Sequence, residues 1–260
     1  FQQINPAPPS GTTNNCVDPD AIQSAVNGTP VQDDATETLL DAEWATAIAP
    51  GATIEVATCD DSSSVTVTPI IGGGTVGTFT PATSNFFGGT YLAALNLINS
   101  NSRPDIISAS YGFGEFFVDS ASKAAIDMMW AQADAEGISV FVASGDSGSN
   151  PSFNGSIING YEGNTAIDAN AMATSPHVTA VGGTDLADVL EGTTSQYFAA
   201  TPSAVGGSAL SYVPEIPWNS SCGNGVAAKA YGYSSALAFC KSYQAIDPTG
   251  LLVTSEASSG

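Results

Sequence analysis

Apolar and polar positions along the middle of the chain alternate between two periodicities. Continuous apolar runs bounded by turn residues predict buried strands, and patterns with a repeat near 3.6 residues predict helices. The predicted strands cover 52–59, 104–112, 138–148 and 177–184, and the predicted helices cover 36–51, 91–100 and 119–136. Strands that are apolar throughout and alternate with helices are typical of a parallel sheet covered on both faces. The pattern therefore predicts an α/β fold, with a parallel sheet flanked by helices.

Two stretches are predicted to be irregular. Residues 1–35 are rich in Pro, Asn, Gly, Thr and Asp, and residues 60–87 are rich in Ser, Thr and Gly, with room for one strand. No internal repeat and no linker divides the sequence, so we expect a single domain over 1–260.

The predicted helix over 36–51 carries two acids four residues apart, Glu37 and Asp41, after Thr36 as its expected N-cap. At about 100° per residue the two acids lie on the same stripe as Trp44 and Ile48, so we expect all four to face the core. The ordinary interpretation of such a pair is a solvated surface pair. Two carboxyls directed into a low-dielectric site would instead share a proton, because both cannot ionise cheaply. Such a pair can act as a general base with a supporting acid.

A third acid, Asp146, follows a predicted strand in the sequence ASGDSG. An aspartate beside glycine is common in ordinary turns. In a parallel α/β sheet, however, active sites gather at the carboxyl ends of the strands, where both SASYG and ASGDSG lie. A protonated Asp146 there could donate a hydrogen bond to a developing oxyanion in an acidic medium.

The charge balance is unusual because basic residues are scarce. The chain has 25 Asp and Glu against 4 Lys and Arg, and a net charge of −21. At low pH each Lys or Arg adds positive self-repulsion while carboxylates become neutral, so this composition favours an acidic extracellular setting. The same charge excludes nucleic acid as a partner. No apolar run approaches the roughly 18 residues of a membrane span, and no signal peptide is visible.

The chain has four cysteines, Cys16, Cys59, Cys222 and Cys240, with no CxxC pair and no neighbouring His to suggest zinc. Two disulfides in an exported protein are the simplest explanation. Of the three possible connectivities we favour Cys16 with Cys59 and Cys222 with Cys240.

Four segments in order resemble the sedolisin family of serine-carboxyl peptidases. They are ETLLDAEWATAIAPGATIEV, IISASYG, GISVFVASGDSG and ATSPHVTAVGGT, with PEIPWN as a weaker continuation. The resemblance covers about residues 30–185 and implies a three-layer domain with the subtilisin fold. It implies a peptidase or tripeptidyl-peptidase that works at acid pH and is secreted or lysosomal, of which we expect the secreted case.

The family pattern assigns three catalytic roles. It makes Glu37 the general base for a nucleophilic serine, Asp41 the acid that orients Glu37, and Asp146 the oxyanion-hole donor.

The same pattern assigns residues that bind the substrate. Ser110, Tyr111 and Gly112 match the strand that pairs with the substrate backbone, although the family more often has Trp at the Tyr111 position. Ser144 and Gly145 match the wall of the pocket for the residue before the scissile bond.

The sequence also departs from the family. It contains no Gly-Thr-Ser motif for the nucleophile, and no first core strand is visible before Cys16. The family's calcium site belongs to the part that would carry that serine, so calcium is implied but not its ligands. We therefore expect an incomplete peptidase domain, inactive alone, whose partners are a peptide substrate and the C-terminal remainder of the same precursor.

Two other functions remain open. The chain could be an exported scaffold or binding module that keeps the peptidase fold without catalysis. It could also be an aspartic-type hydrolase that uses Glu37 and Asp41 alone, although the DTG-like motifs of those enzymes are absent. His177 lies in a strand-like context and not in the helix-start motif that a classical subtilisin triad requires, so we expect it to be a structural or surface residue.

Overall fold

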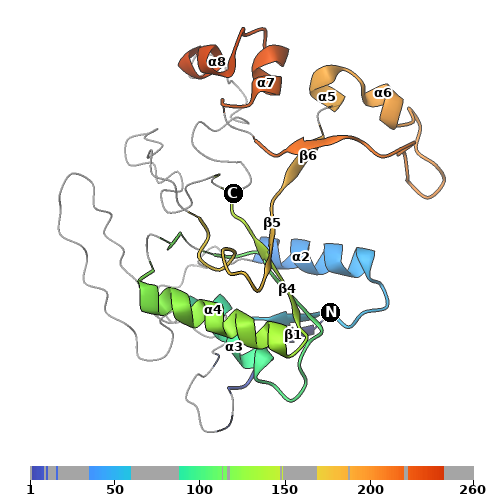
Figure 1. Cartoon of the computed structure of the whole chain (residues 1–260). Helices are drawn as coiled ribbons and strands as arrows, with labels where there is room; N and C mark the ends of the chain where they lie inside the picture. Colours follow the sequence, from blue (N-terminus) through green and yellow to red (C-terminus); the bar gives the residue numbers. More distant parts are fainter. Residues whose placement is uncertain are drawn as a thin grey trace, which may run out of the picture. The chain divides into compact units, whose positions relative to one another are not determined.

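Figure 1 shows the computed structural model of the chain. The structure describes residues 2–8, 10, 16, 35–59, 88–112, 114–115, 118–146, 148, 169–186, 188–219 and 222–242. The strands are β1 (Gln2–Ile4), β2 (Glu55–Ala57), β3 (Ile106–Ala109), β4 (Ser139–Ala143), β5 (Thr179–Val181), β6 (Thr184–Leu186) and β7 (Glu215–Pro217). The helices are α2 (Ala35–Ile48), α3 (Gly88–Ile98), α4 (Ser120–Ala135), α5 (Asp188–Glu191), α6 (Thr194–Tyr197), α7 (Gly225–Ala230) and α8 (Ala236–Ser242).

Strand pairing confirms the α/β class. β1 and β2 pair in parallel, with Gln2 opposite Glu55 and Ile4 opposite Ala57, and α3 packs against β2. β3, β4 and β5 form a three-stranded sheet in that order, and β6 pairs with β7 in the antiparallel sense. Helices alternate with strands from β1 to β4, as the apolar runs predicted, but after β4 the strands β5 and β6 follow directly and the helices come in pairs.

Contacts within the chain define two compact units. The first consists of Phe1–Tyr111 and Ala125–Phe141, and the second of Gly112–Ala124 and Val142–Gly260.

The core of the first unit is built from the inner faces of α3, α4 and β4. Three large side chains are fully buried there: Ile126 and Trp130 on α4, and Ile98 on α3. Each lies on the apolar face of its helix. Asn96 on α3 is also buried, and its Nδ2 donates to the carbonyl of Pro6 at 3.0 Å, which fixes the segment after β1. This bond ties α3 to the chain just after β1.

The second unit contains a small cluster around the disulfide that joins Cys222 and Cys240. Phe239 on α8 is buried and packs against the rings of Tyr231 and Tyr233, with centroids 5.5 and 5.1 Å away. Figure 1 shows α7 and α8 side by side in this cluster. The cross-link substitutes for a larger core in this helix pair.

Both predicted disulfides are present, Cys16–Cys59 and Cys222–Cys240. The two bonds are compatible with an extracellular protein.

Some local predictions were wrong. A three-residue strand, Gln2–Ile4, lies within the segment predicted to be irregular, because pairing with β2 gives its backbone hydrogen bonds that the sequence pattern does not reveal. Helix α2 begins at Ala35, so Thr36 lies in its first turn and is not the N-cap. The predicted strand over 177–184 is interrupted at Gly182 and Gly183, which separate β5 from β6. The predictions for 60–87 lie outside the described residues.

Candidate functional site

Helix α2 is packed only through its N-terminal half in the described structure. Ala42 is 2% exposed, and the neighbouring acids Glu37 and Asp41 are half-buried. Trp44 and Ile48, which share the stripe of the acids, are 64% and 79% exposed. The expectation that these two apolar side chains face the core is therefore wrong. Burial changes along the helix axis, whereas the sequence pattern reports only the direction around it.

The packed part of α2 thus presents carboxyls and small side chains instead of large apolar ones. Glu37 and Asp41 are one turn apart on the same face, a spacing at which side chains of a helix are neighbours. Glu43 lies on the exposed side of the same helix. Glu37 and Asp41 are therefore partly shielded from water, whereas Glu43 is not.

The segment after β3 carries the residues predicted to pair with a substrate backbone. Ser110 and Tyr111 are half-buried, and Gly112 is exposed at its backbone. An ideal Cβ built on Gly112 would lie 2.0 Å from Nδ2 of Asn170, so this position accepts no side chain while Asn170 keeps its place. The glycine is required by this close approach.

The segment after β4 carries the other predicted residues. The backbone N–H of Ser144 donates to the carbonyl of Val181 at 2.8 Å, which anchors the end of β4. The Oγ of Ser144 is buried and has no hydrogen-bond partner within the described part of the chain. Gly145 has φ 112°, a backbone conformation that other residues rarely adopt. This turn leaves Asp146 exposed at the strand end.

The predicted residues fall into two groups. Glu37, Asp41, Ser110 and Tyr111 belong to the first unit. Gly112, Ser144, Gly145 and Asp146 belong to the second unit. Within the second group, three residues lie together because they are consecutive in the chain: Ser144, Gly145 and Asp146.

Asn170 is a residue that the sequence patterns did not single out. Its side chain is buried, its Nδ2 donates to the carbonyl of Ala143 at 2.9 Å, and its Oδ1 accepts the N–H of Met172 at 2.9 Å. It thus lies at the end of β4, beside Gly112. The only signal in the sequence is a lone asparagine before an apolar stretch, which is more often an ordinary turn residue.

His177 is half-buried in the segment before β5, and its backbone N–H lies 3.4 Å from Oγ of Ser175.

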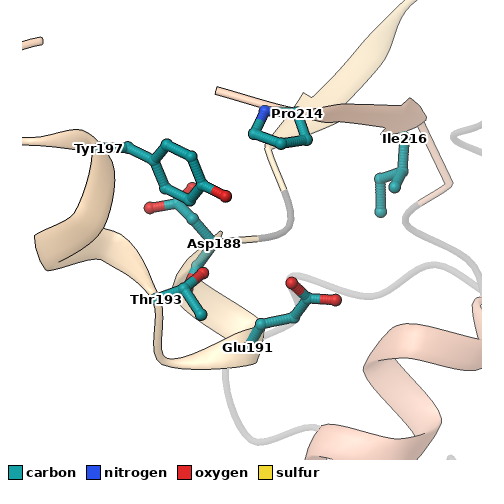
Figure 2. A pocket seen from close by; sticks show the side chains of 6 residues that line it. All are labelled: Asp188, Glu191, Thr193, Tyr197, Pro214 and Ile216. Atoms are coloured by element: carbon teal, nitrogen blue, oxygen red, sulfur yellow. The ribbon is translucent and has the colours of Figure 1, made fainter. Parts of the chain in front are cut away.

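The second unit also has a shallow hollow that contains no predicted site residue. Its lining residues are Asp188, Glu191, Thr193, Tyr197, Pro214 and Ile216 (Figure 2). The backbone of Asp188 accepts the N–H of Thr193 at 2.8 Å, which closes the turn between α5 and α6. The two carboxylates of the hollow, Asp188 and Glu191, offer at most four oxygens, fewer than the roughly six to eight that calcium takes. Across the described segments no group of three or more His, Cys, Asp or Glu side chains could hold a metal ion, so no step is derived through calcium.

None of the helices in the described segments has the length and apolar character needed to cross a membrane.

Comparison with solved structures finds similar chains, among them a sedolisin. A sedolisin of Pseudomonas, a serine-carboxyl proteinase complexed with two molecules of pseudo-iodotyrostatin, matches 72% of this chain at 20% identity and a TM-score of 0.39. The match covers 50% of that chain, so the present chain spans about half the length of the sedolisin. No protein-family model matches the chain, and no curated protein matches it.

Proposed function

We propose that this chain is part of an acid-acting serine-carboxyl peptidase with a subtilisin-like domain, which hydrolyses peptide bonds as an endopeptidase or a tripeptidyl-peptidase. The observation that carries the proposal is the position of Glu37 and Asp41 in the half-buried part of α2, one turn apart, on a helix whose large apolar side chains are exposed. A helix that served only to cover a core would bury Trp44 and leave the acids in water.

The chemistry assigned to the pair is general base catalysis. Glu37 would take the proton of a serine hydroxyl as its Oγ attacks the scissile carbonyl, and would later return it to the leaving amine. Asp41, one turn further along the same face, would hold the Glu37 carboxyl in one orientation by sharing its proton. The proton taken in the first step leaves with the amine as the C–N bond breaks. In the second half Glu37 would take a proton from a water that attacks the acyl ester, and would return it to the serine Oγ as the C–Oγ bond breaks.

Asp146 would supply the electrostatic part of catalysis. It is exposed at the end of β4 after a glycine turn, so its carboxyl is accessible to a bound carbonyl. A carboxyl can donate a hydrogen bond to an oxyanion only while it is protonated, which agrees with an enzyme that works in acid. The scarcity of Lys and Arg supports the same medium.

The nucleophile must come from residues other than the matched segments, because no Gly-Thr-Ser motif is present in the chain. We propose that it is contributed by the C-terminal remainder of the same precursor. The remaining partner is a protein or peptide substrate, which would pair with the backbone of Ser110, Tyr111 and Gly112 and place a side chain against Ser144 and Gly145. The two disulfides support secretion.

The test is peptide cleavage by the full gene product that contains this chain, with an internally quenched peptide at about pH 4. Glu37→Gln should abolish cleavage, because the amide cannot accept the serine proton. The matched control is Glu43→Gln on the exposed side of the same helix, which should keep wild-type activity. Activity that survives Glu37→Gln would contradict the assignment of the base.

A non-catalytic scaffold or binding module is the alternative. It predicts a gene product that binds peptides without cleaving them at any pH, and whose peptide binding is unchanged in Glu37→Gln.

A further inference from the structure

We infer that Asn170 is a positioning residue that fixes the end of β4, which carries Gly145 and Asp146, against the segment that starts at Gly112. The catalytic consequence of this role rests on the proposed function. The physical link itself rests only on contacts within the second unit.

The two polar atoms of the Asn170 side chain form hydrogen bonds with two different backbone segments. Nδ2 donates to the carbonyl of Ala143, the last residue of β4, and Oδ1 accepts from Met172, both at 2.9 Å. The amide orientation is fixed by chemistry, because a carbonyl needs a donor and an N–H needs an acceptor. At 4% exposure, the side chain cannot exchange these partners for water without cost.

The backbone of the same segment is joined to the chain that follows Gly112. Asn170 forms an antiparallel bridge with Gly114, and the N–H of Glu115 donates to the carbonyl of Ala169 at 2.9 Å. A further bond runs from Oγ1 of Thr174 to Oε1 of Glu115 at 2.5 Å. Gly114 and Glu115 are therefore held by the backbone around Asn170, and the end of β4 is held by the Asn170 side chain.

Gly112 shows how closely the parts fit. An ideal Cβ on Gly112 would lie 2.0, 2.2 and 2.3 Å from Nδ2, Oδ1 and Cγ of Asn170. The amide group of Asn170 thus fills the space in front of Gly112 and sets its separation from the end of β4. In the proposed enzyme these two segments carry a substrate-pairing glycine and the oxyanion donor, so a shift in their spacing would misplace the scissile carbonyl.

The first experiment compares Asn170→Ala and Asn170→Asp in the full gene product. Asn170→Ala removes both bonds, and we expect a fall of about 10²-fold in kcat/KM, the size of effect that a misplacement near 1 Å produces. We also expect KM to rise, since the substrate-pairing segment shifts. A purely structural role would reduce the fraction of active enzyme and leave KM unchanged, and that result would overturn the inference.

The second variant adds a pH signature. A carboxyl at position 170 can still accept from Met172, but it can donate to Ala143 only while protonated, and burial at this position would raise the pKa of that carboxyl above the ordinary Asp value of about 4. Asn170→Asp should therefore lose more activity than the parent as pH rises from 3 to 6, and approach the parent at low pH. Among the described residues of 112–115, 143–146 and 169–174, the titratable groups are Glu115 and Asp146, and both are unchanged in parent and variant. An Asn170→Asp profile parallel to that of the parent would contradict the link to Ala143.

The third measurement separates this inference from the proposed function, because it needs no activity. Amide hydrogen exchange of the 260-residue chain should show faster exchange in 112–115 and in 143–146 together when Asn170 is replaced by Ala. The control is Asn99→Ala, which removes exposed side-chain bonds to the Leu95 carbonyl and from Nε2 of Gln132 and should leave both segments unchanged. If the segments respond but the gene product cleaves no peptide, the link stands and the proposed function fails. If neither segment responds while Glu37→Gln still abolishes cleavage, the inference fails alone.

Discussion

Oδ1 of Asp119 accepts the backbone N–H of Ser122 at 2.7 Å, immediately before the first turn of α4. This is the contact of a helix N-cap, in which a side-chain oxygen satisfies one of the free N–H groups of the helix start. The hydrogen bond from the Ser122 backbone, followed by those from the Ser122 side chain and the Ala121 backbone, holds the pKa of Asp119 below its usual value of 3.8. The cap is thus strongest when Asp119 is ionised.

Asp119→Ala should lower the melting temperature, and the loss should depend on pH. Because the pKa of Asp119 is lower in the folded chain, its contribution is present above the unfolded value of 3.8 and is lost as pH falls through the folded value. The difference in melting temperature between parent and variant should therefore be full at about pH 6 and shrink well below pH 3.8. Thermal unfolding followed by circular dichroism across this range measures it. Glu43→Ala, at an exposed carboxylate of α2, is the control, and an equal loss at every pH would contradict the ionised cap.

The disulfide Cys222–Cys240 should provide much of the stability of the α7–α8 pair. It closes a loop with a sequence separation of 18, for which loop entropy alone gives about 3 kcal/mol. Replacing both cysteines by Ala should lower the free energy of unfolding by about that amount. Urea unfolding followed by the near-ultraviolet dichroism of Tyr231 and Tyr233 reports on this cluster. An unchanged transition would show that the Phe239 packing is sufficient without the bond.

The sequence predicted an element well where its pattern of buried positions and its local turn residues indicate the same structure. The helix pattern before Gly137 predicted α4 closely, because Ile126 and Trp130 recur on one face and Gly137, at φ 80°, ends the helix. The parallel strand β1 was not readable, since Gln2–Ile4 contains one apolar residue and depends on its pairing with β2.

The site was readable only in part. The side of α2 that carries Glu37 and Asp41 follows from the helical period, and the exposed Asp146 follows from its glycine turn. The exposure of Trp44 does not follow, because a periodic pattern cannot tell how far along its axis a helix is covered. Asn170 was missed because its side-chain partner Ala143 lies 27 residues away in sequence. No local pattern encodes such a contact.

Trp44 should report directly on the exposure of α2. It is 64% exposed, whereas Trp130 on α4 is fully buried, so the two indoles differ strongly in access to solvent. The third tryptophan, Trp218, is half-buried. Trp44→Phe should therefore remove the largest share of the fluorescence that acrylamide quenches in the 260-residue chain, and shift the remaining emission to shorter wavelength. Trp130→Phe is the opposite control, because it should leave the quenchable component in place. If Trp44→Phe leaves quenching unchanged, the C-terminal half of α2 is covered.

Asp146 offers a prediction that distinguishes an oxyanion donor from an ordinary turn residue. Asp146→Ala should lower kcat of the full gene product by about 10²- to 10³-fold, the usual cost of removing one oxyanion donor. Asp146→Asn should retain much more activity and extend it to higher pH, because an amide donates a hydrogen bond whether or not the medium is acidic. The measurement is kcat for one quenched peptide from about pH 3 to pH 7 with both variants. If Asp146 were only a turn residue, both variants would lower Tm and leave the pH profile of kcat unchanged. Since Asp146 is exposed and follows Gly145, neither substitution removes core packing, so a large kcat effect without a change in Tm can be assigned to the chemistry.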